Sequence, residues 1–264
     1  MTKTAICLHG ISSGMTDKLP DGQGDIEKSF EMIRDNIILP NDSDVYMHTW
    51  SHGDVEEVIS SYAPKKSLVE KQIVFHENNW LDNLKHIRRR LFYNHDHKSR
   101  KNSLLSRWYS LMKSVELARL NEIELGIKYD YIFVTRFDLS LNQKITFKNL
   151  DQTKFYVGDW PRWYDYAGKE LNEIDVSKGA GFKYKGKKGF PYDSEGLHDF
   201  WFLSNSEAMG VFSECYKKID SIILKCGLSS HKIALQNIID NHLLETLEFH
   251  LQFASDYTLS RWVD

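Results

Sequence analysis

The chain has little cysteine, no long apolar run and no excess of one charge. Its 264 residues contain three cysteines, and none of them has a CxxC or zinc-like spacing, which argues against a disulfide framework and a zinc module. No stretch approaches the roughly 18 apolar residues of a membrane helix. The first ten residues carry too few apolar side chains for a signal peptide. We therefore expect a soluble cytoplasmic protein with reduced thiols.

The charge balance gives no general case for a polyanionic partner. Lys and Arg number 34 against 37 Asp and Glu, a net charge of −3, so neither nucleic acid nor an anionic membrane is indicated. A single domain of this length can bury roughly 70–75% of the surface that its unfolded chain exposes. We see no internal repeat and no linker-like composition. The sequence therefore predicts one domain over residues 1–264.

Strand-like and helical segments alternate over the first half of the chain. The predicted strands cover 4–8, 44–50, 67–75, 131–135, 145–147, 154–157 and 199–203. The predicted helices cover 26–37, 55–62, 80–91, 103–125, 206–226 and 231–249. This order is typical of an α/β fold with a mostly parallel sheet and helices on both faces. Residues 158–198 form a long aromatic and basic segment without clear periodicity, which is usually functional or disordered.

The most informative stretch is 129–140. Residues 131–135 are an apolar, β-branched and aromatic run typical of a buried strand, and Arg136 and Asp138 follow directly. Side chains two residues apart in a strand point the same way. Ligands of α/β sheets gather at the carboxyl ends of strands, so this pair suits a phosphorylated or metal-bound ligand. The alternative is a surface ion pair that caps the strand.

The first strand ends in His9 and Gly10, followed by a Ser/Gly loop. Glycine lets a ligand approach the backbone closely, so this loop is a candidate nucleotide site, with an ordinary tight turn as the alternative. An α/β-hydrolase would also use backbone N–H groups at this place. It needs a Gly-x-Ser-x-Gly nucleophile elbow, which the sequence lacks.

Acid and base candidates precede or begin the late apolar strand. Asp199 is the preferred general base, Glu195 the second carboxylate, and the adjacent His198 an alternative base or metal ligand. A carboxylate near the sheet edge can deprotonate a sugar hydroxyl. The alternative for each acid is a solvated loop residue.

The ordered series of these segments resembles the GT-A-type glycosyltransferases, in particular small single-domain members from bacterial surface-polysaccharide clusters and large viruses. The resemblance extends from residue 4 to about residue 250. The segments that carry it are 6–14, 44–50, Arg107-Trp108-Tyr109-Ser110, 129–138 and 199–204.

The resemblance implies a GT-A-like fold and transfer of a hexose or deoxyhexose from a nucleoside-diphosphate sugar to a glycan acceptor in polysaccharide biosynthesis. The nucleotide would lie against His9 and Gly10. Asp138 matches the second Asp of the family's metal-binding Asp-x-Asp motif and would hold Mn²⁺ or Mg²⁺ on the diphosphate. Arg136 stands at the first Asp, where a guanidinium would neutralise diphosphate directly.

The resemblance further implies that Asp199 or Glu195 is the catalytic carboxylate and that 158–198 forms the acceptor side. Trp160, Trp163 and Tyr164 would cover the apolar faces of the acceptor sugar. A non-catalytic nucleotide- or glycan-binding module is the alternative from another functional class, and an α/β-hydrolase is a further one.

Overall fold

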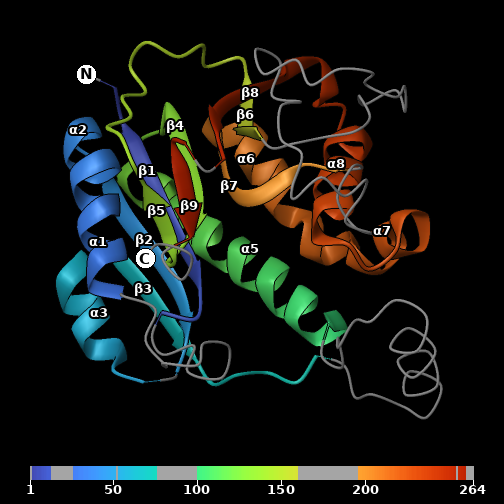
Figure 1. Ribbon diagram of the computed structural model, residues 1–264, viewed down its shortest axis with the longest axis horizontal. Coiled ribbons are helices and arrows are strands. Elements are labelled where there is room, and N and C mark those ends of the chain that lie inside the picture. The colour runs from blue at the N-terminus through green and yellow to red at the C-terminus, as the bar shows by residue number, and fades with distance from the viewer. Residues whose placement is uncertain are drawn as a thin grey trace.

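A computed structural model describes residues 2–12, 26–51, 53–75, 100–159, 196–253 and 255–259. A central sheet of seven strands has the order β3-β2-β1-β4-β7-β6-β8, and β5 and β9 form a separate pair (Figure 1). The strands are β1 (Thr4–Gly10), β2 (Asp44–Trp50), β3 (Lys66–Glu70), β4 (Tyr131–Arg136), β5 (Leu139–Leu141), β6 (Phe155–Asp159), β7 (His198–Ser204), β8 (Leu247–Gln252) and β9 (Tyr257–Leu259).

Four neighbouring strands of the sheet, β3, β2, β1 and β4, run parallel. β7 runs antiparallel to both β4 and β6, whereas β8 is parallel to β6. The prediction of an α/β fold with a mostly parallel sheet is confirmed. Because β7 runs against β4, the amino end of β7 lies beside the carboxyl end of β4.

Helices cover both faces of the sheet. In Figure 1, α1 to α3 (blue to cyan) lie on the left, and α5 (green) with α6 to α8 (orange to red) lie in the centre and on the right. The helical segments are α1 (Ile26–Ile33), the π-helical η2 (Arg34–Ile38), α2 (Leu39–Asn41), α3 (Val55–Tyr62), α5 (Arg100–Leu125), α6 (Ser206–Ser213), the 3₁₀ segment η5 (Glu214–Lys218), α7 (Ile219–Cys226), α8 (Ser230–Asp240) and the 3₁₀ segment η6 (Leu244–Thr246).

Two hydrophobic clusters lie on the two faces, because alternate residues of a strand point to opposite sides. Cys7 of β1 and Val134 of β4 pack on the side of α5, whereas Leu8 and Phe133 pack on the other side. β1 and β4 are buried along almost their whole length, which explains their continuous apolar sequences. The first cluster joins α5 to α6 and α8, and the second joins the sheet to α1 and α3.

The chain changes direction across the sheet between β1 and β4. From β1 it proceeds to β2 and β3 on one side, and then α5 leads back to β4 on the other side of β1. His9 and Arg136 are register partners at the carboxyl ends of these two strands. Ligands of open α/β sheets usually bind beyond the strand ends at such a reversal.

Several predicted elements are corrected. Residues 145–147 are not a strand, because the amides of Ile145 and Phe147 bond the carbonyl of Asn36 and the side chain of Asn41 instead of a neighbouring strand. The predicted strand 67–75 ends at Glu70, and helix 103–125 begins at Arg100.

The second half of the chain needs larger corrections. The predicted helix 206–226 is divided into α6, η5 and α7. The predicted helix 231–249 ends at Asp240, His242 turns the chain with a φ of 59°, and the last residues become strand β8. The predicted helix 80–91 lies outside the described residues, as does all but the ends of the segment 158–198.

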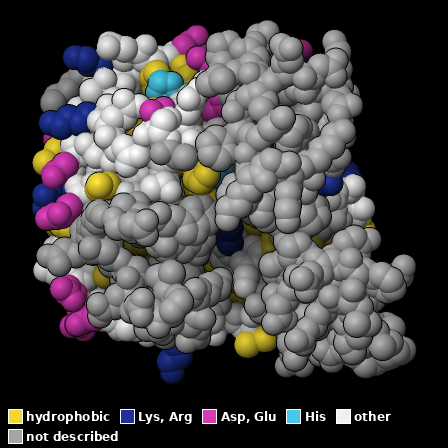
Figure 2. Space-filling model, in the orientation of Figure 1, with side chains coloured by type: hydrophobic (Ala, Val, Ile, Leu, Met, Phe, Trp, Pro, Cys, Tyr) yellow, Lys and Arg dark blue, Asp and Glu magenta, His cyan; other side chains and the backbone are white. Residues whose placement is uncertain are grey.

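The surface of the described part carries both charge signs. Figure 2 shows acidic and basic side chains interspersed along the margin formed by α1 to α3. All three cysteines are unpaired, as predicted. No helix in the described part of the chain is long and apolar enough to cross a membrane.

Candidate functional site

The candidate site lies at the carboxyl ends of β1 and β4 and the amino end of β7. His9 closes β1 with only 2% of its surface exposed. Gly10 follows with a φ of 109°, a conformation that L side chains rarely adopt, so a glycine is required there. No described atom lies within 4 Å of the place where a Cβ would stand. Within the described residues, the backbone after β1 is therefore open on that side.

Arg136 and Asp138 meet each other, as their spacing predicts. The Arg136 Nε donates to Asp138 Oδ1 at 2.7 Å, and Nη2 donates to Oδ2 at 2.5 Å. The guanidinium also lies over the Phe200 ring at 5.4 Å. The pair is mostly shielded, with side-chain exposures of 16% and 24%. A bidentate fork with a stacked ring fixes the plane of the guanidinium at the sheet edge.

A second arginine reaches the site from α5. Arg107 Nη1 lies 2.5 Å from Asp199 Oδ2, and Arg107 Nη2 donates to the Asp199 carbonyl. On the other side of the carboxylate, His231 Nδ1 lies 3.3 Å from Asp199 Oδ1 and 3.0 Å from the Leu197 carbonyl. Asp199, near the start of β7, is thus contacted by one residue of α5 and one residue of α8.

The environment of Asp199 determines its protonation. Burial raises the pKa of Asp199, but the charges of Arg107 and His231 outweigh it and hold this pKa well below its usual range. A carboxylate with such a low pKa is a weak proton acceptor. The geometry therefore favours Asp199 as the residue that orients Arg107 and His231 over the predicted role of general base.

His9 lies among these charges as a neutral imidazole. Burial, followed by the charges of Arg107 and Arg136, lowers the pKa of His9 well below its ordinary value. Its Nδ1 is buried and has no hydrogen-bond partner in the described part of the chain. A buried polar atom without a partner is costly, and it is one feature of this edge that a bound ligand would relieve.

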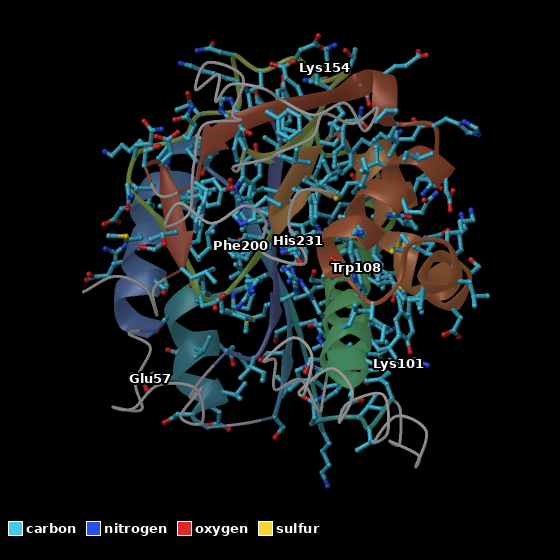
Figure 3. All side chains as sticks on the ribbon, turned by 45° about the vertical axis from the view of Figure 1, so that its right-hand side comes forward. Glu57, Lys101, Trp108, Lys154, Phe200 and His231 are labelled. Atoms are coloured by element: carbon cyan, nitrogen blue, oxygen red, sulfur yellow. The ribbon has the colours of Figure 1, made fainter. Side chains whose placement is uncertain are left out.

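Aromatic rings line the β7 side of the site. The His198 ring lies 4.0 Å from the Phe200 ring and 6.0 Å from the His231 ring, and Figure 3 shows Phe200 and His231 near the middle of the molecule. His198 itself is buried, and its Nδ1 shares a hydrogen bond with the Tyr257 hydroxyl. Burial lowers the pKa of His198 well below its ordinary value, so His198 is a neutral structural group here.

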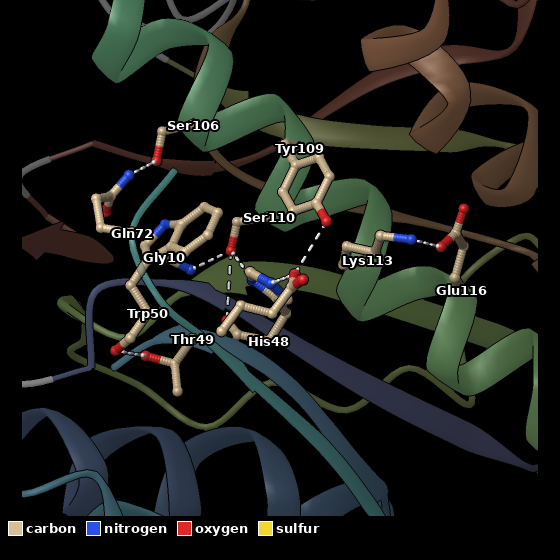
Figure 4. A network of polar contacts seen from close by, with 11 residues as sticks. Gly10, His48, Thr49, Trp50, Gln72, Ser106, Tyr109, Ser110, Lys113 and Glu116 are labelled. Atoms are coloured by element: carbon tan, nitrogen blue, oxygen red, sulfur yellow. Dashed lines mark hydrogen bonds and ion pairs between the residues drawn. The ribbon is translucent and has the colours of Figure 1, made fainter. Parts of the chain in front are cut away.

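A serine, a histidine and a glutamate form a chain beside this site (Figure 4). Ser110 Oγ lies 2.7 Å from His48 Nδ1, and His48 Nε2 lies 2.8 Å from Glu70 Oε2. The order of groups is that of a hydrolase triad. Ser110, however, is fully buried in α5 and its Oγ accepts the Gly10 N–H at 2.8 Å. A hydroxyl that no substrate can reach is not a nucleophile.

The described residues contain no group of three or more His, Cys, Asp or Glu that could hold a metal ion. Asp138, the predicted metal ligand, binds the Arg136 fork with both of its oxygens. A divalent cation at Asp138 would therefore have to share these oxygens with the fork or displace it, and would complete its shell with ligand oxygens or water.

The structure brings the predicted residues His9, Gly10, Arg136, Asp138 and Asp199 to one sheet edge. The other predicted site residues lie outside the described part of the chain: Glu195, Trp160, Trp163 and Tyr164.

Sequence reasoning assigned no separate role to Arg107, His231, His48 or Glu70. Arg107 precedes Ser110 by one helical turn and so shares its face of α5, but this spacing does not indicate its contact with Asp199. For the other three, only the fold shows the proximity.

No protein-family model and no curated protein matches the sequence. Fold and site geometry therefore carry the functional argument.

Proposed function

We propose that the protein is a glycosyltransferase that moves a sugar from a nucleoside-diphosphate sugar to a glycan acceptor. The observation that supports this most is the register pair of His9 and Arg136 at the β1–β4 reversal, beside a second guanidinium from Arg107. Two guanidinium groups near the strand ends offer donors for the phosphate oxygens of a diphosphate, in addition to the carboxylates that they already bind.

Each group has a distinct part in this proposal. Arg136 binds the diphosphate and stabilises the negative charge that develops on the departing nucleoside diphosphate. His9 and the Gly10 backbone contact the nucleotide. Asp138 orients Arg136. If Mn²⁺ or Mg²⁺ bound with the diphosphate, Asp138 would be the residue to hold the cation, which would supply further charge neutralisation.

The acceptor hydroxyl needs a proton acceptor. Asp199, whose carboxylate is ionised but strongly paired, orients His231, and we assign the general-base step to His231 with Asp199 behind it. Glu195 stays the alternative base from the sequence. Trp160, Trp163 and Tyr164 stay the proposed acceptor-binding residues.

A donor panel tests the proposal. Thermal unfolding is followed with UDP-, GDP- and CMP-sugars, with and without Mn²⁺, and donor hydrolysis is measured in parallel. We expect a diphosphate sugar to raise the unfolding temperature and to be hydrolysed slowly, because ligands that bind only the folded state stabilise it. CMP-sugars, which carry a single phosphate, should have little effect. No shift with any diphosphate sugar would contradict the proposal.

A non-catalytic binding module is the second candidate. It is favoured by one observation, that both site carboxylates, Asp138 and Asp199, are engaged by arginines. This candidate predicts stabilisation by a diphosphate sugar without hydrolysis or transfer to any acceptor.

A further inference from the structure

We propose that Ser110, His48 and Glu70 form a positioning chain that holds the backbone after β1 ready for the donor. The chain starts at the Gly10 amide, passes through α5 and β2, and ends at the edge strand β3 (Figure 4). This inference rests on the proposed function, because it assigns these residues to the nucleotide loop of that site.

The three hydrogen bonds of the positioning chain are all donated in one direction, from Gly10 towards Glu70. A carboxylate only accepts hydrogen bonds, so His48 Nε2 carries the proton that it donates to Glu70 Oε2 at 2.8 Å. Nδ1 of the neutral ring is then an acceptor, and the Ser110 hydroxyl donates to it at 2.7 Å, a shorter contact than the 3.3 Å from the same hydroxyl to the His48 carbonyl. The lone pairs of Ser110 Oγ are left for the Gly10 N–H, which donates at 2.8 Å. Consecutive bonds in one direction reinforce one another.

The tautomer of His48 is fixed from its far end. The Tyr109 hydroxyl also donates to Glu70 Oε2, at 3.0 Å, and Lys113 lies nearby with its Nζ 5.6 Å from the Tyr109 ring centroid. Burial lowers the pKa of His48, although Glu70 opposes this. Burial raises the pKa of Glu70, but its hydrogen bonds from His48 and Tyr109 give a net decrease. Both directions favour a neutral ring beside a charged carboxylate.

The positioning chain is buried at its Ser110 end and partly exposed at its Glu70 end. Ser110 and His48 are fully buried, whereas the Glu70 side chain is 30% exposed. A second tie holds the same loop, since Thr49 Oγ1 donates to Ser12 Oγ at 2.8 Å and both groups are buried. The segment from Gly10 to Ser12 is therefore fixed at both of its ends.

A loop that is ordered before the ligand arrives has a smaller entropic cost on binding. With its φ of 109°, Gly10 directs its amide to Ser110. Ser110 is thus a positioning residue, because it acts on the donor through the backbone and does not touch it. Loss of the chain should weaken donor binding more than it slows the chemical step.

The experiment compares Ser110→Ala with Ser114→Ala. Ser114 is a matched control, since it is a fully buried serine one turn further along α5 whose hydroxyl donates to the Leu111 carbonyl within the helix. Hydrogen exchange of the Gly10 amide and donor KM and kcat are measured for both. For Ser110→Ala we expect about tenfold faster exchange and about tenfold higher donor KM, with kcat changed less than KM. Ser114→Ala should leave all three near the wild-type values.

A second pair of variants keeps the test decisive if Ser110→Ala does not fold. Glu70→Leu removes the acceptor of His48 on the accessible edge strand, whereas Glu70→Gln retains an oxygen at that place. We expect Glu70→Leu to accelerate Gly10 exchange and Glu70→Gln to preserve the slow rate. A local role in β3 would not reach Gly10.

Equal exchange rates and donor KM values in the Ser110 and Ser114 variants would overturn the positioning chain. If the wild-type protein binds no nucleotide sugar, the proposed function fails, and exchange at Gly10 alone decides whether the chain holds the loop.

Discussion

Two arginines of this protein make nearly the same contacts in very different places. Arg34 of η2 donates to both oxygens of Asp35 at 2.7 and 3.1 Å and lies 5.3 Å over the Phe30 ring. Arg136 binds Asp138 in the same bidentate way and lies 5.4 Å over the Phe200 ring.

The difference between the pairs is their surroundings. The side chains of Arg34 and Asp35 are 40% and 49% exposed, against 16% and 24% for Arg136 and Asp138. Arg136 stands next to buried His9 at the β1–β4 reversal, whereas Arg34 lies on a helical surface. The comparison teaches that an arginine–carboxylate fork alone indicates no site. A site is indicated where such a fork also lies at a strand end, is shielded from solvent and has a buried polar atom without a hydrogen-bond partner beside it, as His9 Nδ1 is in the described part of the protein.

The third arginine–carboxylate pair extends the comparison towards greater burial. In Arg107–Asp199 the carboxylate is only 2% exposed. Arg107→Met should therefore destabilise the fold by about 3–5 kcal/mol, because it leaves a buried charge without its main partner. Chemical denaturation measures this loss.

The double variant Arg107→Met/Asp199→Leu is the control for the Arg107 prediction. It removes both charges together and should recover part of the lost stability. A single variant as stable as the wild type would show that Asp199 does not depend on Arg107.

The sheet edge also differs from the helical surface in that it contains buried histidines. Burial lowers the pKa of His9, His48 and His198 from the ordinary 6.5. The unfolded chain then binds more protons than the folded one below about pH 6.5, so stability falls as the pH drops through that value. The expected slope is about 1 kcal/mol per pH unit for each histidine. Denaturant unfolding at pH 7.5 and pH 5.5 measures it.

The carboxylates that share this edge act at lower pH. Asp199 and Glu70 have lowered pKa values, so their contribution is present above the unfolded carboxyl pKa and lost only in stronger acid. His9→Gln removes one of the three buried histidines and should reduce the loss of unfolding free energy between pH 7.5 and pH 5.5. An unchanged profile would argue against a neutral buried His9.

The carboxylates of the two forks allow a smaller test. Asp138→Asn removes a negative charge that competes with diphosphate for Arg136. Without added metal we expect it to tighten binding of a nucleoside diphosphate by about fivefold, which is about 1 kcal/mol of relieved repulsion. Any gain that Mn²⁺ gives the wild type should disappear in this variant. Asp35→Asn should change neither quantity, and titration calorimetry measures both.

The first half of the fold was predictable because each signal was local and strong. β1, β2 and β4 are continuous apolar runs, and α3 has Asp54 as its N-cap, bonded to the Glu57 amide. Burial on both faces makes such strands visible without a partner.

The second half of the fold was predicted less accurately, because turns interrupt segments whose apolar residues have helical spacing. The predicted helix continued the apolar pattern of α8 to Leu247 and beyond, yet the chain turns at His242 and Leu247–Gln252 forms β8. β5 and β9 are three residues long, which is too short for any periodicity to appear.

The site was predictable where its residues follow strands, as with His9, Arg136 and Asp138. It was not predictable where helices bring distant residues to the same edge. Arg107 and His231 reach Asp199 from α5 and α8, and no sequence spacing encodes that meeting. The role that we propose for Asp199 differs from the predicted one for the same reason, since its pKa depends on these two partners.

The most direct test of the central claim is a titration of the preferred diphosphate sugar into Arg136→Gln and Arg34→Gln. Each variant breaks a bidentate arginine–aspartate fork and removes a contact between the guanidinium and a phenylalanine ring. We expect Arg136→Gln to weaken donor binding by at least about tenfold, because a charge-assisted bond to phosphate is lost, and Arg34→Gln to bind like the wild type. Equal affinities in the two variants would contradict a diphosphate site at the β1–β4 edge.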